Sequence, residues 1–233
     1  MSRTLIILLL WIPLLLPAQN LVKNPSFEIK NGCPDQPGQV SLARFWISPN
    51  TGTPDYFNDC SPGLDYGTEF NKKGGRQPHS GHAYAGMQFY LLNHNEFYEY
   101  VQTVLDTTLT AGNLYCVSAW VSLGKSTYGI RQLGALLSAT EIKEQGSHKM
   151  KLPAVPLGSG KYLLDQDQWM CIKGVYKAKG SEKLLTIGDF TSGDSFWNIA
   201  TQSPTDSLFK STYYFIDDVS VEAIRDSSEF RCR

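Results

Sequence analysis

The chain has 233 residues, of which 42% are hydrophobic and 12% aromatic, enough to bury a sizeable core. Its formal net charge is −1 and no run of basic residues occurs, which argues against nucleic acid and anionic membranes as partners. The 20 glycines and 12 prolines favour strands joined by turns.

The first residues, MSRTLIILLLWIPLLLPAQN, have the pattern of a secretory signal peptide. One basic residue, Arg3, precedes an apolar run from Leu5 to Leu16, and the small Ala18 follows. A retained membrane anchor is the alternative, but the run is shorter than the ~20 residues that a spanning helix needs. We therefore expect secretion to the periplasm, the cell surface or the exterior.

Five cysteines in a secreted chain predict disulfides. Cys33 and Cys60 flank a loop-rich segment with little core of its own, so we predict that they pair. Cys116 and Cys171 fall in the more polar rows of two predicted strands, which allows a second bridge if those strands are neighbours; two unpaired thiols are an equal alternative. Cys232, in the tail, is then free or intermolecular. No Cys-x-x-Cys pair indicates zinc.

Strand signals bounded by turn residues dominate the mature chain, and no window predicts a long helix. This pattern predicts an all-β fold, an antiparallel β-sandwich of the jelly-roll type, over residues 19–225, after a signal peptide at 1–18 and before a tail at 226–233. Two long loops, about Lys30–His79 and Ala139–Gln168, interrupt it. The expected strands are Leu21–Val22, Ala83–Phe89, Tyr98–Leu105, Leu114–Leu123, Leu133–Leu137, Trp169–Ala178, Leu184–Phe190 and Tyr213–Ile224.

The last of these strands, YYFIDDVSV, carries two adjacent carboxylates. Strict alternation puts Asp217 in one row with Phe215, Val219 and Val221, and Asp218 in the other row. A buried, unpaired carboxylate is costly, so Asp217 needs a cationic partner or access to water. Asp218, on the other face, is expected to be solvated.

Five motifs in order carry a family resemblance. NLVKNPSFE, PDYFNDC, GHAYAGM, EYVQTVLDTTLTAGNLYCVSAWVSL and YYFIDDVSV resemble secreted and envelope proteins of Bacteroidetes-type bacteria, in which this sandwich often precedes an OmpA-like domain. The opening N-x-x-F-E and closing I-D-D-V-x-V are similar to galactose-binding-like jelly rolls, which include many carbohydrate-binding modules. The resemblance implies the fold more strongly than any activity.

The resemblance also implies a structural calcium ion between the first and last strands. The matching positions are Glu28 and Asp217, with Asn24 or a backbone carbonyl adding oxygen. The alternative is that Asp217 accepts hydrogen bonds from backbone amides or pairs with a cation such as Lys23 or Arg44.

A sugar site needs an exposed aromatic ring, for the C–H face of a pyranose, and polar groups for its hydroxyls. Trp120 and Trp169 lie in the more polar rows of their strands and are the first candidates for such a platform. Packing within the core is the alternative for every candidate. The long loops add aromatic and polar candidates, which are Trp46, Tyr56, Trp197, Asp55 and Asn58.

Evidence for an enzyme is weaker. His79, Ser80 and His82 match neither a zinc-protease nor a serine-hydrolase motif, and no pair of carboxylates is singled out. We predict no catalytic residues. The expected function is a secreted, non-catalytic binding module for carbohydrate or envelope glycan; the alternatives are an adhesion component that binds another protein and, third, a hydrolase.

Overall fold

The structure is a computed structural model that describes residues 19–63, 65–91, 97–126, 128–158, 160–191, 197–198 and 211–226. Side chains of residues 90, 91, 197, 198 and 211 lie outside the description. The expected signal peptide, Cys232 and the side chain of Trp197 therefore lie outside the described residues. Within the described ranges, no helix is long and apolar enough to cross a membrane.

Twelve strands and one short 3-10 helix make up the regular structure of the described residues, and every paired strand runs antiparallel to its neighbour. Ten strands form one sheet in the order β1-β4-β10-β7-β8-β9-β5-β12-β3-β2, and β6 pairs with β11. The elements are η1 (Val40–Leu42), β1 (Trp46–Ile47), β2 (Asp55–Asn58), β3 (Ala83–Leu91), β4 (Val101–Val104), β5 (Leu114–Leu123), β6 (Tyr128–Gly129), β7 (Gln132–Ser138), β8 (Val155–Gly158), β9 (Met170–Lys177), β10 (Leu184–Gly188), β11 (Trp197–Asn198) and β12 (Ser211–Ile224).

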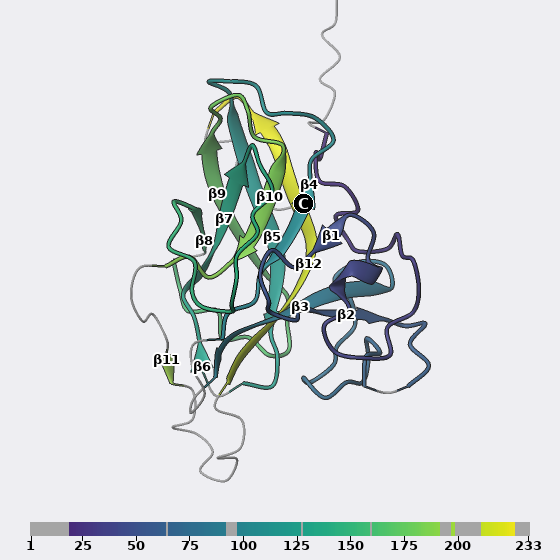
Figure 1. The fold of residues 1–233 in the computed structure, drawn as a ribbon. Coiled ribbons are helices and arrows are strands. Elements are labelled where there is room, and N and C mark those ends of the chain that lie inside the picture. Colours follow the sequence, from purple (N-terminus) through teal and green to yellow (C-terminus); the bar gives the residue numbers. More distant parts are fainter. Residues whose placement is uncertain are drawn as a thin grey trace, which may run out of the picture.

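The ten-stranded sheet curls on itself into a two-layered β-sandwich, which Figure 1 shows. The core between the layers is one cluster of buried residues drawn from both halves of the sheet. Val117 and Val121 of β5, for example, lie in the same cluster as Leu133 of β7 and Ile187 of β10. The predicted all-β antiparallel fold is confirmed.

Sequence alternation located the long strands well. The range Leu114–Leu123 is found unchanged as β5, whose apolar row faces the core. Leu21–Val22 makes only an isolated bridge, Val22 to Leu105. Both long loops contain strands that were not expected, β1 and β2 in the first and β8 in the second.

A β-bulge changes the rows that strict alternation assigned to β12. Asp217 pairs with Trp120 of β5 and Ser220 with Ser118, so two residues of β12 lie opposite one of β5. Asp218 takes up the bulge with a positive φ of 44°. Val219 therefore faces the main core, while Asp217 lies on the outer face, and the expectation that the two share a row was wrong.

A second buried carboxylate, Glu99, joins two parts of the same layer. Its Oε1 accepts hydrogen bonds from the backbone N–H (2.9 Å) and the hydroxyl (3.1 Å) of Thr53, and its Oε2 accepts one from Gln88 N–H at 2.7 Å. Burial, and next the nearby charge of Asp55, raise the pKa of Glu99 to about 7. Glu99 thus ties β3 to the segment that precedes β2.

The raised pKa of Glu99 makes the free energy of unfolding depend on pH. Between pH 4.5 and about 7 the unfolded chain releases a proton that folded Glu99 retains, so stability falls as the pH rises through this range. In Glu99→Gln the free energy of unfolding should fall less steeply with pH. The difference in this free energy between the variant and the wild type should therefore shrink towards pH 7. Denaturant unfolding across this range measures both; a constant or growing difference would contradict the assignment.

The Cys33–Cys60 bridge is confirmed, with the two Cα atoms 5.5 Å apart. The Cys116–Cys171 bridge was wrong, although β5 and β9 are neighbours. Cys171 lies opposite Trp120, four residues along β5 from Cys116, which is about 13 Å at ~3.3 Å per residue and too far for a disulfide. Cys116 remains a buried thiol, whereas Cys171 is disulfide-bonded.

The states of Cys116 and Cys171 are testable. A thiol reagent applied to the denatured, unreduced protein should modify Cys116 and should leave Cys33, Cys60 and Cys171 unmodified. Peptide mapping without reductant should recover Cys33 with Cys60, and Cys171 in a disulfide-linked peptide. Modification of Cys171, or an unmodified Cys116, would contradict this assignment.

Candidate functional site

Four of the side chains predicted to face a ligand are buried instead, and this corrects the sequence analysis. Trp46 and Tyr56 belong to the main core, with exposed fractions of 1% and 0%. The carboxylate of buried Asp55 accepts hydrogen bonds from the Tyr213 hydroxyl and from a backbone N–H. Asn58 donates to the Tyr56 hydroxyl at 3.0 Å. These residues build the sandwich and present no surface to a sugar.

Trp120 lies on the outer face of β5 and Trp169 directly precedes β9, and the structure brings the two rings together around His79. The His79 ring stacks on Trp120 with centroids 4.0 Å apart, and it meets Trp169 edge-on at 6.2 Å. Trp169 also has Arg76 over its ring and donates its indole N–H to the Gln77 carbonyl at 3.0 Å. Both rings are half-buried and hold residues 76–79 against the sheet.

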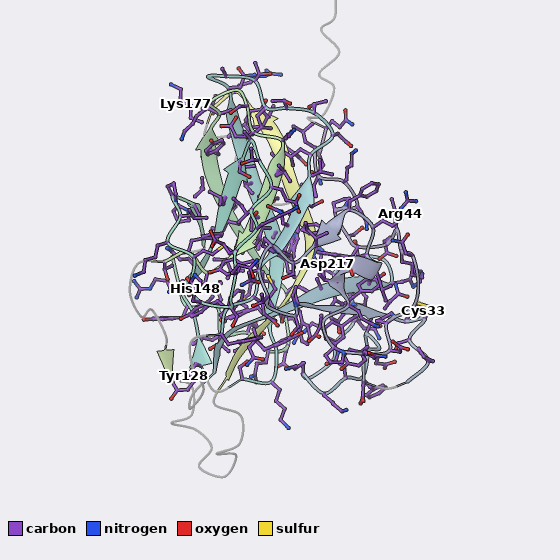
Figure 2. The ribbon with its side chains drawn as sticks, in the orientation of Figure 1. Cys33, Arg44, Tyr128, His148, Lys177 and Asp217 are labelled. Carbon is purple, nitrogen blue, oxygen red and sulfur yellow. A yellow bond between two sulfur atoms is a disulfide. The ribbon has the colours of Figure 1, made fainter. Side chains whose placement is uncertain are left out.

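Asp217 is fully buried beneath this segment, near the centre of the molecule in Figure 2. Its carboxylate accepts hydrogen bonds from three backbone N–H groups, those of His79 (2.9 Å), Ser80 (3.1 Å) and Asp218 (2.7 Å). Burial, and next the charge of Asp218, raise the pKa of Asp217 to about 8. The alternative in which Asp217 binds backbone amides is therefore the arrangement found.

Asp218 is not simply solvated, as was expected. Its Oδ2 lies 2.5 Å from His79 Nδ1, and its Oδ1 accepts a hydrogen bond from the Ser80 hydroxyl at 2.7 Å. Ser80 and His79 both contact the Asp218 carboxylate, whereas in a hydrolytic triad the serine hydroxyl is hydrogen-bonded to the histidine ring. The two adjacent carboxylates of β12 thus bind the backbone and the side chains of the same loop.

The residues predicted to bind calcium have other partners. The Asn24 amide donates to the carbonyls of Ile29 and Arg44 and accepts from Ile29 N–H, so it does not fit the role of a ligand. Glu28 accepts a hydrogen bond from His82 N–H at 2.8 Å. Among the residues that the structure describes, no three His, Cys, Asp or Glu side chains form a group able to hold a metal. Two carboxylates are fewer than the six to eight oxygens that calcium takes.

The calcium ion stays a prediction, which now rests on Glu28 and Asp217 alone. If it binds there, excess EDTA should lower the melting temperature, added calcium should restore it, and Asp217→Asn should lose the difference. Glu141→Gln, at an exposed carboxylate elsewhere, is the control. Identical melting curves of the wild type in EDTA and in calcium would count against the site.

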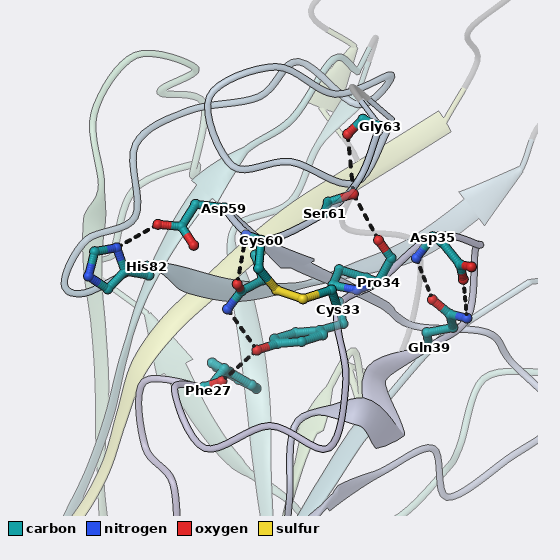
Figure 3. The surroundings of a disulfide bond; sticks show 12 residues. Phe27, Cys33, Pro34, Asp35, Gln39, Asp59, Cys60, Ser61, Gly63 and His82 are labelled. Atoms are coloured by element: carbon teal, nitrogen blue, oxygen red, sulfur yellow. Dashed lines mark hydrogen bonds and ion pairs between the residues drawn. A yellow bond between two sulfur atoms is a disulfide. The ribbon is translucent and has the colours of Figure 1, made fainter.

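The segment from Asp59 to His82, without Leu64, forms loops beside β2 and β3, drawn in blue at the lower right of Figure 1. The Cys33–Cys60 disulfide holds its first residues beside the opening loop of the chain, as Figure 3 shows. The Tyr84 hydroxyl donates to the Thr68 carbonyl at 2.7 Å in its middle, and Asp217 and Glu28 hold its end.

Two clefts open on this segment, and Phe70 and Glu69 line both. The first cleft, of about 280 Å³, continues along Ser61, Gln77 and the Asp59–His82 pair, whose side chains lie 2.6 Å apart. The second, of about 510 Å³, continues towards Lys125, Gln166 and Asp167. Phe70 is 62% exposed, the highest value among the large apolar side chains described as exposed. An exposed ring between clefts that also present polar side chains is the kind of surface that a sugar requires.

The sequence analysis passed over Phe70. It lies in GTEFNKKGG, a polar stretch without period, where an isolated aromatic residue gives no sign of its exposure. The one local sign that Phe70 is exposed is that both its neighbours in sequence, Glu69 and Asn71, are polar. That pattern also fits a loop residue that packs inward, as Tyr66 in the same segment does against Phe57.

Comparison with known proteins yields similar folds at low identity. No family model matches the chain, and no curated protein does. The chain is similar to the CBM22-1 xylan-binding domain of Paenibacillus barcinonensis Xyn10C, at 12% identity and a TM-score of 0.47 over 90% of this chain and 99% of that one.

Two further structures are similar. One is a protein from Bacteroides thetaiotaomicron that is described provisionally as sugar-binding. It shares 10% identity at a TM-score of 0.42, over 88% of this chain and 100% of that one. The K1 cleaved adhesin domain of Lys-gingipain from Porphyromonas gingivalis shares 16% identity at 0.37, over 85% of this chain and 96% of that one. At these values the likeness has no bearing on ligand or activity.

Proposed function

We propose that the chain is a secreted, non-catalytic carbohydrate-binding domain whose ligand lies against Phe70. The observation that carries the proposal is the exposed Phe70 ring between two clefts whose walls are partly polar and partly apolar. A ring exposed to this extent gains little from folding, because it belongs to neither hydrophobic cluster of the described residues. Burial under the C–H face of a pyranose would remove that apolar surface from water.

The surroundings of Phe70 suit a binding surface better than a reaction centre. Glu69, Gln77, Gln166 and Asp167 are exposed around it and offer both donors and acceptors to hydroxyls. Asp217, Tyr84 and the Cys33–Cys60 disulfide hold the Asp59–His82 segment in place; the first two do so by hydrogen bonds to its backbone. A rigid support of this kind limits the ordering cost of binding.

A glycan array followed by titration with the best polysaccharide tests the proposal. Phe70→Ala should weaken binding by about tenfold or more, since truncation of an aromatic anchor costs about 2 kcal/mol. Phe70→Tyr should retain binding. The matched control is Phe45→Ala, which removes another exposed ring that lines neither cleft. Equal binding by Phe70→Ala and the wild type, or no binding to any glycan, would overturn the proposal.

A protein partner is the second candidate function, and a different surface favours it. Ile29 and Phe45 are 48% and 39% exposed and lie on neighbouring chain segments, because Arg44 N–H donates to the Ile29 carbonyl. Lys23 and Arg44 lie over the Phe45 ring at 5.3 and 5.2 Å, and Figure 2 shows Arg44 at the edge of the molecule. Apolar side chains beside cations are typical of contacts between proteins.

A further inference from the structure

The two clefts at Phe70 share one wall. Phe70 and Glu69 are the residues common to both, and the other lining residues of each cleft come from different parts of the chain. Besides Glu69 and Phe70, the first cleft is lined from residues 59–63, 67–68, 77–78 and 81–82, and the second from residues 71, 74–75, 123–125 and 166–167. Phe70 therefore stands between two open spaces and does not close the end of one.

Each space is of the size of a ligand subsite. Volumes of about 280 and 510 Å³ lie near or within the ~300–1,000 Å³ usual for small-molecule pockets. A sugar ring stacked on Phe70 would have room for a further residue on each side. A site that recognised the end of a polysaccharide would need a wall on one side of the ring. Here the cleft on each side is open, with the exposed side chain of Gln77 in one and that of Gln166 in the other.

The charges in the two clefts select among glycans. Glu69 lies in both clefts, Asp59 in the first and Asp167 in the second, so carboxylates face the ligand on both sides of Phe70. Lys125 brings one positive charge to the second cleft, and His82 lies against Asp59 in the first. Like charges brought together in a binding site cost affinity, so uronate or sulfate groups are disfavoured here.

From this arrangement we propose that the site binds an internal stretch of an extended, uncharged polysaccharide, with one sugar on Phe70 and its neighbours in the two clefts. The inference rests on the proposed function and adds the length and the charge of the ligand. Contacts on both sides of the ring make affinity grow with chain length until both clefts are filled. Gln77 and Gln166 then serve separate subsites of one chain.

Titration calorimetry with defined oligosaccharides tests the length. The probes are cello-, manno- and xylo-oligosaccharides of one to six residues. For the series that binds, affinity should rise by at least about tenfold from the monosaccharide to the longer chains and then level off. Gln77→Ala and Gln166→Ala should each weaken the long chains by severalfold and reduce the advantage of length; Phe45→Ala should change neither. Circular-dichroism melting confirms that the variants fold.

Oligogalacturonates of the same lengths test the charge. They should bind more weakly than the neutral series, and Glu69→Gln should narrow the difference in affinity between the two series. Affinity that is equal for monomers and long chains, or stronger for galacturonates, would overturn this inference and leave the proposed function standing. Failure of every neutral and acidic probe, and of the glycan array, would overturn both.

Discussion

The cleft region depends on a buried carboxylate that binds backbone amides. Asp217 is fully buried and accepts hydrogen bonds from three N–H groups, two of them from the loop that carries His79 and Ser80. A buried acceptor that loses its donors keeps its full desolvation cost, so the loop is held where the Asp217 side chain is. Asp218, Trp120 and Trp169 surround the same loop through His79 and Gln77.

The bulge in β12 makes this arrangement compatible with a packed core. One extra residue lets Val219 and Val221 continue the inner row while Asp217 faces outward under the loop. β12 also lies between β5 and β3, so it pairs on both edges along part of its length. A polar anchor is thereby built into a central strand without placing a charge between the two layers.

How far the sequence predicts the structure depends on the range of the interaction. Alternation within β5 is local, and it gave the strand and its inner face. Tyr56 was read as a loop residue because β2 is short and lies among prolines and glycines, and only its pairing with Ala85 shows that it is buried. The distance between Cys116 and Cys171 depends on the register in which β5 pairs with β9. The exposure of Phe70 depends on the distant chain segments that line the two clefts. None of these appears in a local pattern.

The distance along the chain between Asp217 and its partners has a consequence for biosynthesis. His79 and Asp217 are separated by 138 residues, and the Leu21 N–H binds the Val221 carbonyl. The opening loop and both cleft walls are therefore made long before the strand that fixes them, and contacts of such separation form slowly. Until β12 is made, the end of the segment that carries Phe70 lacks the hydrogen bonds that Asp217 accepts. A chain interrupted before β12 would carry every residue of the first cleft and the Cys33–Cys60 disulfide, but not the two carboxylates beneath the loop of His79 and Ser80.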